Sequence, residues 1–192
     1  MSLQFARLIV VLFGIVIGLA PVGAQAQLKV ADAVAVRGAV HLGDELRAPA
    51  GGGARLRFTD GSAMSIGENT VITVHAYSQQ ASTRMTILEM LSGIFRAVVP
   101  PLTGDSVFAV RTPTAIAAVR STDWMLATRS DLTEVFVGDG AVAVRNIDPA
   151  ITAEVVLMNG DGTDVKPNEA PLSPRKWGPP RIRAFEERTN IN

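Results

Sequence analysis

The chain of 192 residues has no cysteine, only two histidines and few aromatic residues, which make up 5% of it. Without cysteine it can form no disulfide, no thiolate nucleophile and no cysteine-ligated metal site. A stable fold must therefore come from a hydrophobic core. With 47% hydrophobic residues, a chain of this length buries roughly 70% of its unfolded surface, so a single domain is expected.

An excess of positive charge is also missing, because 18 basic residues are balanced by 18 acidic ones. Nucleic-acid phosphates require a basic face on the protein that binds them. With balanced charge, we therefore expect no nucleic-acid partner. Anionic lipids attract clustered lysines and arginines, and the sequence has no such cluster either.

The usual groups of an active site are equally scarce. His41 and His75 lie in alternating apolar and polar stretches, and no G-x-S-x-G motif is present. A serine nucleophile needs a base beside it. The turn acids Asp44, Asp60 and Glu68 are not placed in one cleft by any sequence pattern. We predict no catalytic residue, no cofactor and no metal ligand, and hence a protein that is not an enzyme.

Long apolar runs are limited to one, Leu8 to Ala20, whose 13 residues fall short of the ~20 that span a bilayer. The small-x-small pattern Ala24-Gln25-Ala26 follows it, as signal peptidase requires. A retained anchor helix is the alternative, and its length makes it the weaker one. We predict a signal peptide over 1–26, cleaved after Ala26, and a periplasmic or secreted protein with no membrane span after cleavage.

Apolar and polar residues alternate with period two along most of the remaining chain, which predicts strands. Residues 54–59 alternate and end at Asp60-Gly61, a dipeptide that favours a two-residue hairpin turn. Residues 62–66 return along them and place Met64 and Ile66 on one face, with Leu56 and Phe58 available as partners. Residues 84–91 fit a strand or a short helical turn, and we favour a strand because residues 94–99 continue the pattern.

Further strands are predicted at 33–36, 39–42, 71–74, 107–110, 134–137, 141–144, 155–158 and 163–165. Gly138-Asp139-Gly140 and Asn159 to Gly162 are interpreted as hairpin turns. Weak calcium binding is the alternative for their acidic residues, although both lack the spacing of an EF-hand loop. The fold class is all-β, with many short strands in a twisted solenoid-like or sandwich domain.

A change of composition at Pro167 divides the chain into a β domain over 27–166 and a Pro-rich tail over 167–192, whose residues 182–188 favour one or two helical turns. Trp177 lies in the basic, proline-rich part of this tail. Its indole has three possible uses: docking onto its own domain, stacking on a sugar, or anchoring a partner. Docking onto the domain is the preferred interpretation.

The segment RTPTAIAAVRSTDW, residues 111–124, places charged residues within apolar sequence. Pro113 fixes its φ and holds Thr112 extended, as at a strand end, and the small residues 115–119 let two β layers approach. Arg120 has five donors in a planar fork. Our hypothesis is that Arg120 bonds Asp123 or nearby turn carbonyls as a structural clasp, in preference to a ligand site.

These stretches, taken in order along residues 30–165, resemble the FecR domain family of bacterial periplasmic regulators. The landmarks are Gly43-Asp44, the hairpin ARLRFTDGS of residues 54–62, IGENT of 66–70, LSGIF of 91–95, VRTPTA of 110–115 with AVRSTDW of 118–124, and the strand pair of 137–144. Ser121 stands where the family usually has glycine. The family motif residues are Asp60, Gly61, Ser62, Gly93, Thr112, Pro113, Val119, Arg120, Thr122 and Asp123.

The resemblance implies a non-enzymatic periplasmic module that binds or regulates in envelope signalling. FecR regulators of the signalling type relay the state of an outer-membrane transporter to a sigma factor through a cytoplasmic segment. Only seven residues precede the apolar run, so we expect no such segment here. The expected partner is an envelope protein, and the alternative is peptidoglycan or another polysaccharide, with Trp177 as a possible contact.

Overall fold

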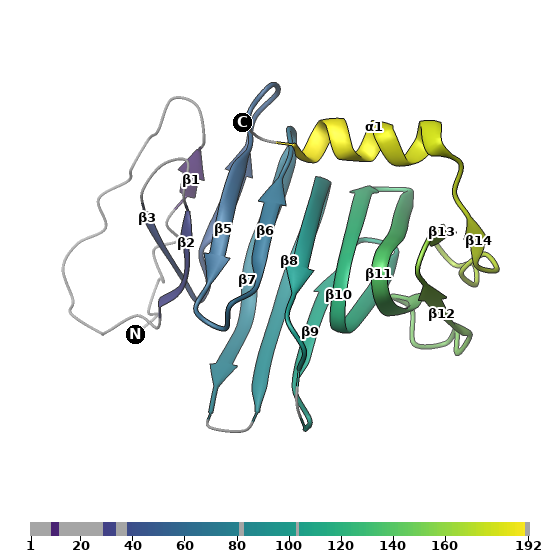
Figure 1. Cartoon of the computed structure of the whole chain (residues 1–192), viewed down its shortest axis with the longest axis horizontal. Helices are drawn as coiled ribbons and strands as arrows, with labels where there is room; N and C mark the ends of the chain where they lie inside the picture. The colour runs from purple at the N-terminus through teal and green to yellow at the C-terminus, as the bar shows by residue number, and fades with distance from the viewer. Residues whose placement is uncertain (1–8, 12–28, 34–37, 81–82, 103, 191–192) are drawn as a thin grey trace, which may run out of the picture.

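The computed structural model describes residues 9–11, 29–33, 38–80, 83–102 and 104–190, and the fold in this part of the chain is all-β with one helix (Figure 1). The prediction of an all-β domain is therefore confirmed. The elements are β1 (Ile9–Val11), β2 (Lys29–Ala33), β3 (Gly38–His41), β4 (Glu45–Ala48), β5 (Ala54–Phe58), β6 (Ala63–Ile66), β7 (Thr70–Gln79), β8 (Arg84–Val99), β9 (Val107–Arg111), β10 (Ala115–Arg129), β11 (Leu132–Asn146), β12 (Glu154–Met158), β13 (Asp161–Val165), β14 (Arg175–Lys176) and α1 (Pro179–Thr189).

Most of the predicted signal peptide, and the cleavage site after Ala26, lie outside the described residues. Within residues 1–26 only β1 is described, and it pairs in parallel with β4. Most of the strand expected at 33–36 also lies outside, since β2 ends at Ala33. In the described ranges, α1 is too short to cross a membrane and no other helix occurs.

The predicted hairpin of β5 and β6 forms, and its register places Leu56 opposite Met64. Its connection is longer than predicted, because four residues, 59–62, separate the two strands. The Ser62 amide donates to Asp60 Oδ1 at 2.8 Å, and Gly61 has a φ of 88°. Arg84 Nη1 donates to the Asp60 carbonyl at 2.8 Å. Asp60 and Ser62 are thus buried and bonded within this turn.

Two predicted hairpins are wrong. Gly138-Asp139-Gly140 is not a turn, because β11 runs through it and keeps pairing with β10 on both sides. The strands β12 and β13 do not form a hairpin with each other. Each pairs with β11, at residues 141–145 and 133–136 respectively. Glycines at an irregular point inside a long strand carry the same local sequence signal as glycines in a turn.

Each of the long strands β8, β10 and β11 changes its neighbours part-way along. Before Gly93, β8 pairs with β7 and with β9, and from Gly93 onward it pairs with β10 and β6. The strand β10 pairs with β9 up to Val119 and with β8 from Thr122. The same three strands therefore contribute to two layers, which are continuous through them, as in packings where strands turn corners.

The first layer contains β4, β7, β9 and β12 with the first halves of β8 and β10 and the second half of β11. The second layer contains β3, β2, β5, β6, β13 and β14 with the remaining halves. The two layers enclose the main core. Phe58 of β5 meets Phe108 of β9 edge to face across it, with ring centroids 5.9 Å apart.

Gly93 marks the corner of β8. Its φ is 106°, and a β-carbon at this position would lie under 3.0 Å from the side chain and the Cα of Thr70. Thr70 Oγ1 accepts a hydrogen bond from the Ile94 amide at 3.1 Å and donates to the Gly67 carbonyl at 2.7 Å. The corner therefore needs a residue that has no side chain and that tolerates a positive φ.

Gly93→Ala should lower the free energy of unfolding by about 3 kcal/mol or more, because backbone strain and a steric clash add together. The matched control is Gly51→Ala. Gly51 also has a positive φ, 68°, but nothing lies within 4 Å of its β-carbon position, so only the conformational cost of about 1 kcal/mol applies. Chemical denaturation measures both, and equal losses would contradict the close approach at Gly93.

Candidate functional site

The segment from Val119 to Asp123 forms the corner of β10. Two residues, Arg120 and Ser121, stand opposite the single residue Ala141 of β11, which is a β-bulge. Thr122 Oγ1 donates to the Ala141 carbonyl at 2.9 Å, and the Leu102 amide donates to the Arg120 carbonyl at 2.8 Å. Ser121 is exposed and lies outside the positive-φ positions, so the corner tolerates its β-carbon.

The Arg120–Asp123 clasp is wrong. The Arg120 side chain is exposed and has no hydrogen bond or ion pair with a described residue. Arg96 binds Asp123 instead, with Nε to Oδ1 at 2.9 Å and Nη2 to Oδ2 at 2.7 Å. The hydrogen bond with Asp123 raises the pKa of Arg96 against the opposing effect of burial. The bulge explains the difference, because Arg120 lies beside Val107 and Val156 of the first layer, while Asp123 lies opposite Val98 of the second.

Thr112 and Pro113 lie at the end of β9, as predicted. The Ala115 amide donates to Thr112 Oγ1 at 2.8 Å, and Thr112 Oγ1 lies 2.7 Å from Thr133 Oγ1. Thr114 Oγ1 donates to Thr133 Oγ1 at 2.7 Å. These buried hydroxyls satisfy one another and brace the turn into β10. With Val119 and Thr122 buried as well, most of the family motif residues support the backbone.

Trp177 docks onto its own domain, which confirms the preferred interpretation. Its ring stacks on Phe136 at 5.2 Å and meets the edge of Phe185 at 5.0 Å. The Arg181 guanidinium carbon lies 3.7 Å from the ring centroid. Only 7% of Trp177 is exposed, so the indole offers no face on which a sugar could stack. The alternative in which Trp177 stacks on a sugar is therefore not supported.

The segment from Arg175 to Asn190, here called the C-terminal strap, covers the outer side of the second layer. Trp177 and Phe185 pack there on Ile94, Met125 and Phe136. Figure 1 shows α1 lying across the ends of the strands of this layer. The predicted helix at 182–188 is confirmed in a longer form, because prolines are accepted in the first turn of a helix and α1 begins at Pro179.

Arg181 ties the strap to the sheet through Asp164, with Nη2 to Oδ1 at 2.5 Å, and through Glu134. Burial lowers the pKa of Arg181, but the bonds with Asp164 and Glu134 outweigh it and raise the pKa overall. Lys176 Nζ lies 2.9 Å from Asp161 Oδ1. Bonds from Lys176 and from the Met158 amide lower the pKa of Asp161, which shows that this turn acid is used within the protein.

Trp177→Ala should release the strap. Removing a buried tryptophan costs about 3–5 kcal/mol, which is enough to detach a short segment while the sheet stays folded. The expected result is rapid tryptic cleavage within the strap, after Arg175, Lys176 or Arg181, with β-sheet circular dichroism unchanged. Val156→Ala is the control, because Val156 is exposed. Equal protease resistance of the variant and the wild type would contradict the packing described.

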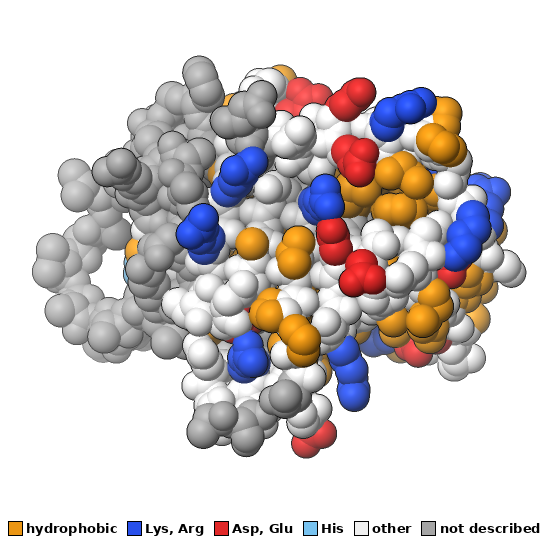
Figure 2. Space-filling view, viewed as in Figure 1, with side chains coloured by type: hydrophobic (Ala, Val, Ile, Leu, Met, Phe, Trp, Pro, Cys, Tyr) orange, Lys and Arg blue, Asp and Glu red, His pale blue; other side chains and the backbone are white. Residues whose placement is uncertain are grey.

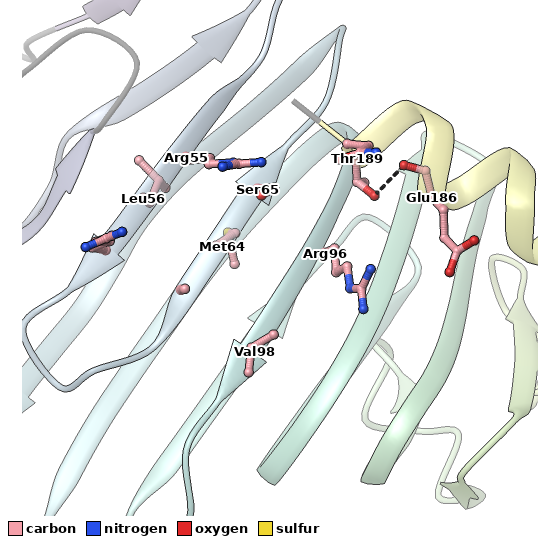
Figure 3. Close-up of a pocket in the computed structure, with 11 residues that line it drawn as sticks. Arg55, Leu56, Met64, Ser65, Arg96, Val98, Glu186 and Thr189 are labelled. Carbon is pink, nitrogen blue, oxygen red and sulfur yellow. Dashed lines mark hydrogen bonds between the residues drawn. The ribbon is translucent and has the colours of Figure 1, made fainter. Parts of the chain in front are cut away.

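A groove lies along β6 on the outer side of the second layer, with a volume of about 580 Å³. The strand β6 presents only Ala63 and Ser65 to this side, and longer side chains flank it on the neighbouring strands. The cross-strand rows are Arg55–Ser65–Arg96 and Arg57–Ala63–Val98. Figure 3 shows Arg55 and Arg96 on opposite sides of the groove, with Glu186 and Thr189 of α1 at one end.

The two walls of the groove differ in charge. Arg55 and Arg57 are exposed, and neither side chain bonds to any residue that the structure describes. Arg96 is bonded by Asp123 and lies near Glu186. Figure 2 shows basic side chains over β5 and acidic side chains nearer to α1. We name this feature the β6 groove. In the described part of the chain no group of three or more acidic or histidine side chains could hold a metal.

Comparison with family models gives a match to "FecR protein" over residues 44–143, just over half of the chain. The chain belongs to the FecR family. The matched region of this FecR domain contains the corners of β8 and β10 and both walls of the β6 groove, whereas the C-terminal strap lies beyond it. A search of curated proteins found no match.

Solved structures confirm the fold of this FecR domain. Two crystal structures from Parabacteroides distasonis ATCC 8503, each described as a "putative anti-sigma factor", are similar to it. The first has 18% identity and a TM-score of 0.58, and covers 73% of this chain. The second has 20% identity and a TM-score of 0.61, and covers 75%. This chain spans 63% and 64% of those chains, slightly less than two thirds of each.

The corrected pairing of Asp123 can be tested with two arginine substitutions. Arg96→Met should lower the free energy of unfolding by about 0.5–1 kcal/mol, the range for a partly exposed ion pair. Arg120→Met should change it by less than about 0.5 kcal/mol, because its exposed side chain has no bonding partner among the described residues. Urea denaturation measures both values. A larger loss of unfolding free energy for Arg120→Met than for Arg96→Met would support a bond between Arg120 and Asp123.

Proposed function

We propose that this FecR domain is a non-catalytic binding module that acts in signalling at the bacterial envelope through contact with a protein partner. The observation that carries the proposal is the family match, which includes the corners joining the two layers. The similarity to proteins described as anti-sigma factors supports a regulatory role with protein partners. The open β6 groove suits contact with a macromolecule, since one wall has two exposed arginines that bond to none of the residues the structure describes.

Export to the periplasm is part of the proposal, and it depends on the N-terminal sequence. The apolar run from Leu8 and the small-x-small site at Ala24 to Ala26 support a cleaved signal peptide. Glycan binding has less support, because Trp177, its possible contact residue, is buried. A protein is therefore the partner that we propose.

The test expresses the full chain with a C-terminal tag in a Gram-negative host, followed by cell fractionation and sequencing of the mature N-terminus. We expect periplasmic protein that begins at Gln27. A photo-crosslinking residue placed at exposed positions of both layers should then capture a defined envelope protein. Retention in the cytoplasm would contradict export. Sedimentation with purified peptidoglycan without any protein crosslink would overturn the proposed partner class.

A further inference from the structure

We infer that the β6 groove binds an extended peptide segment of the partner, with two carboxylate side chains two residues apart. The inference rests on the proposed function, because it specifies the chemistry of the protein partner. Three features of the groove support it: its width, the spacing of its arginines and the change of charge toward α1.

The width of the groove suits one extended chain. Its walls are β5 and β8, which both pair with β6 and therefore lie two strand spacings apart, about 9–10 Å. The floor consists of the small side chains of Ala63 and Ser65. A single extended peptide with its side chains has a comparable width, whereas a helix with its side chains is about 10–12 Å across. An extended segment is therefore the better fit.

The arginine spacing matches the period of an extended chain. Arg55 and Arg57 point to the same side of β5, about 7 Å apart along the strand. In a bound peptide, side chains two residues apart also point to one side at about 7 Å. Two carboxylates at this spacing would meet both guanidinium groups, each of which is a planar fork that binds carboxylates with two hydrogen bonds.

The opposite wall sets the character of the remaining peptide side chains. Val98, on this wall, is 49% exposed, and an apolar side chain of the peptide could pack against it. Arg96 is already neutralised by Asp123, and Glu186 closes the end beside α1. An acidic residue next to Glu186 would be repelled, so the segment should be acidic beside β5 and uncharged or basic beside α1. Apolar contact also favours a peptide over an anionic polysaccharide.

Fluorescence anisotropy with labelled peptides on the mature full chain tests the inference. One eight-residue peptide has aspartates at positions 3 and 5 with valine at position 4, and a second has the same composition with aspartates at positions 3 and 6. The first should bind at least fivefold more tightly, because only its carboxylates share one side. Its binding should weaken with added salt, since exposed charges are screened.

Variants of the protein separate charge from shape. Arg55→Glu with Arg57→Glu should weaken the first peptide at least tenfold. Ser65→Leu should do so without changing any charge, because it fills the floor of the groove. Arg129→Glu is the matched control, since Arg129 is an exposed arginine paired with Asp131 away from the groove, and it should change binding less than twofold.

Several results would overturn the inference. These are equal binding of the two peptides, unchanged binding by the double arginine variant, or tighter binding of polygalacturonate or phosphatidylglycerol vesicles than of the first peptide. If the photo-crosslinked envelope protein is still captured by the double variant, the groove assignment fails while the proposed function stands. If the wild type captures no envelope protein, the proposed function itself fails.

Discussion

The close approach of backbones at the strand corners is the constraint on which the rest of the structure depends. The strands β8, β10 and β11 each serve two layers, and they change neighbours where side chains have no room. At one corner Gly93 faces Thr70, and at the other Gly140, with a φ of 94°, faces the Ser121 carbonyl, with under 3.0 Å left for a β-carbon in each case. Without these corners the two layers could not enclose one core, and the β6 groove would lose its wall on β8.

The C-terminal strap completes the second layer in a different way. A sheet between a core and solvent needs one apolar side, but this layer is apolar on both sides at Ile94, Met125 and Phe136. Trp177 and Phe185 bury that outer patch, and Arg181 bonds to Asp164 and Glu134 beside it. The same helix ends beside the groove, so Glu186 and Thr189 belong to both features. A disulfide-free domain thereby gains a second small core and shapes its candidate binding surface with one segment.

The motif residues and the groove residues have different roles. Thr112, Thr122 and Asp60 are buried and bond the backbone at turns and corners, so a motif search finds the parts that maintain the fold. Arg55 and Arg57 look, in the sequence, like the ordinary polar positions of an alternating strand. Their one local signal is that both point to the same side. What makes them a candidate site is the small floor of β6 and the end of α1, which lies far along the chain from both.

Period-two alternation and turn chemistry are local properties, and they were sufficient to predict an all-β fold and the β5–β6 hairpin, whereas the register of that hairpin, with Leu56 opposite Met64, comes from the structure. Which strand or side chain each residue pairs with is not a local property of the sequence. Gly138 to Gly140 reads as a turn, yet β11 continues through it because β10 and β12 pair with it beyond that point. Likewise Asp123 has Arg120 close in sequence but binds Arg96, 27 residues away. A bulge sends neighbouring side chains to different layers, and only the assembled tertiary structure decides which distant strand each one meets.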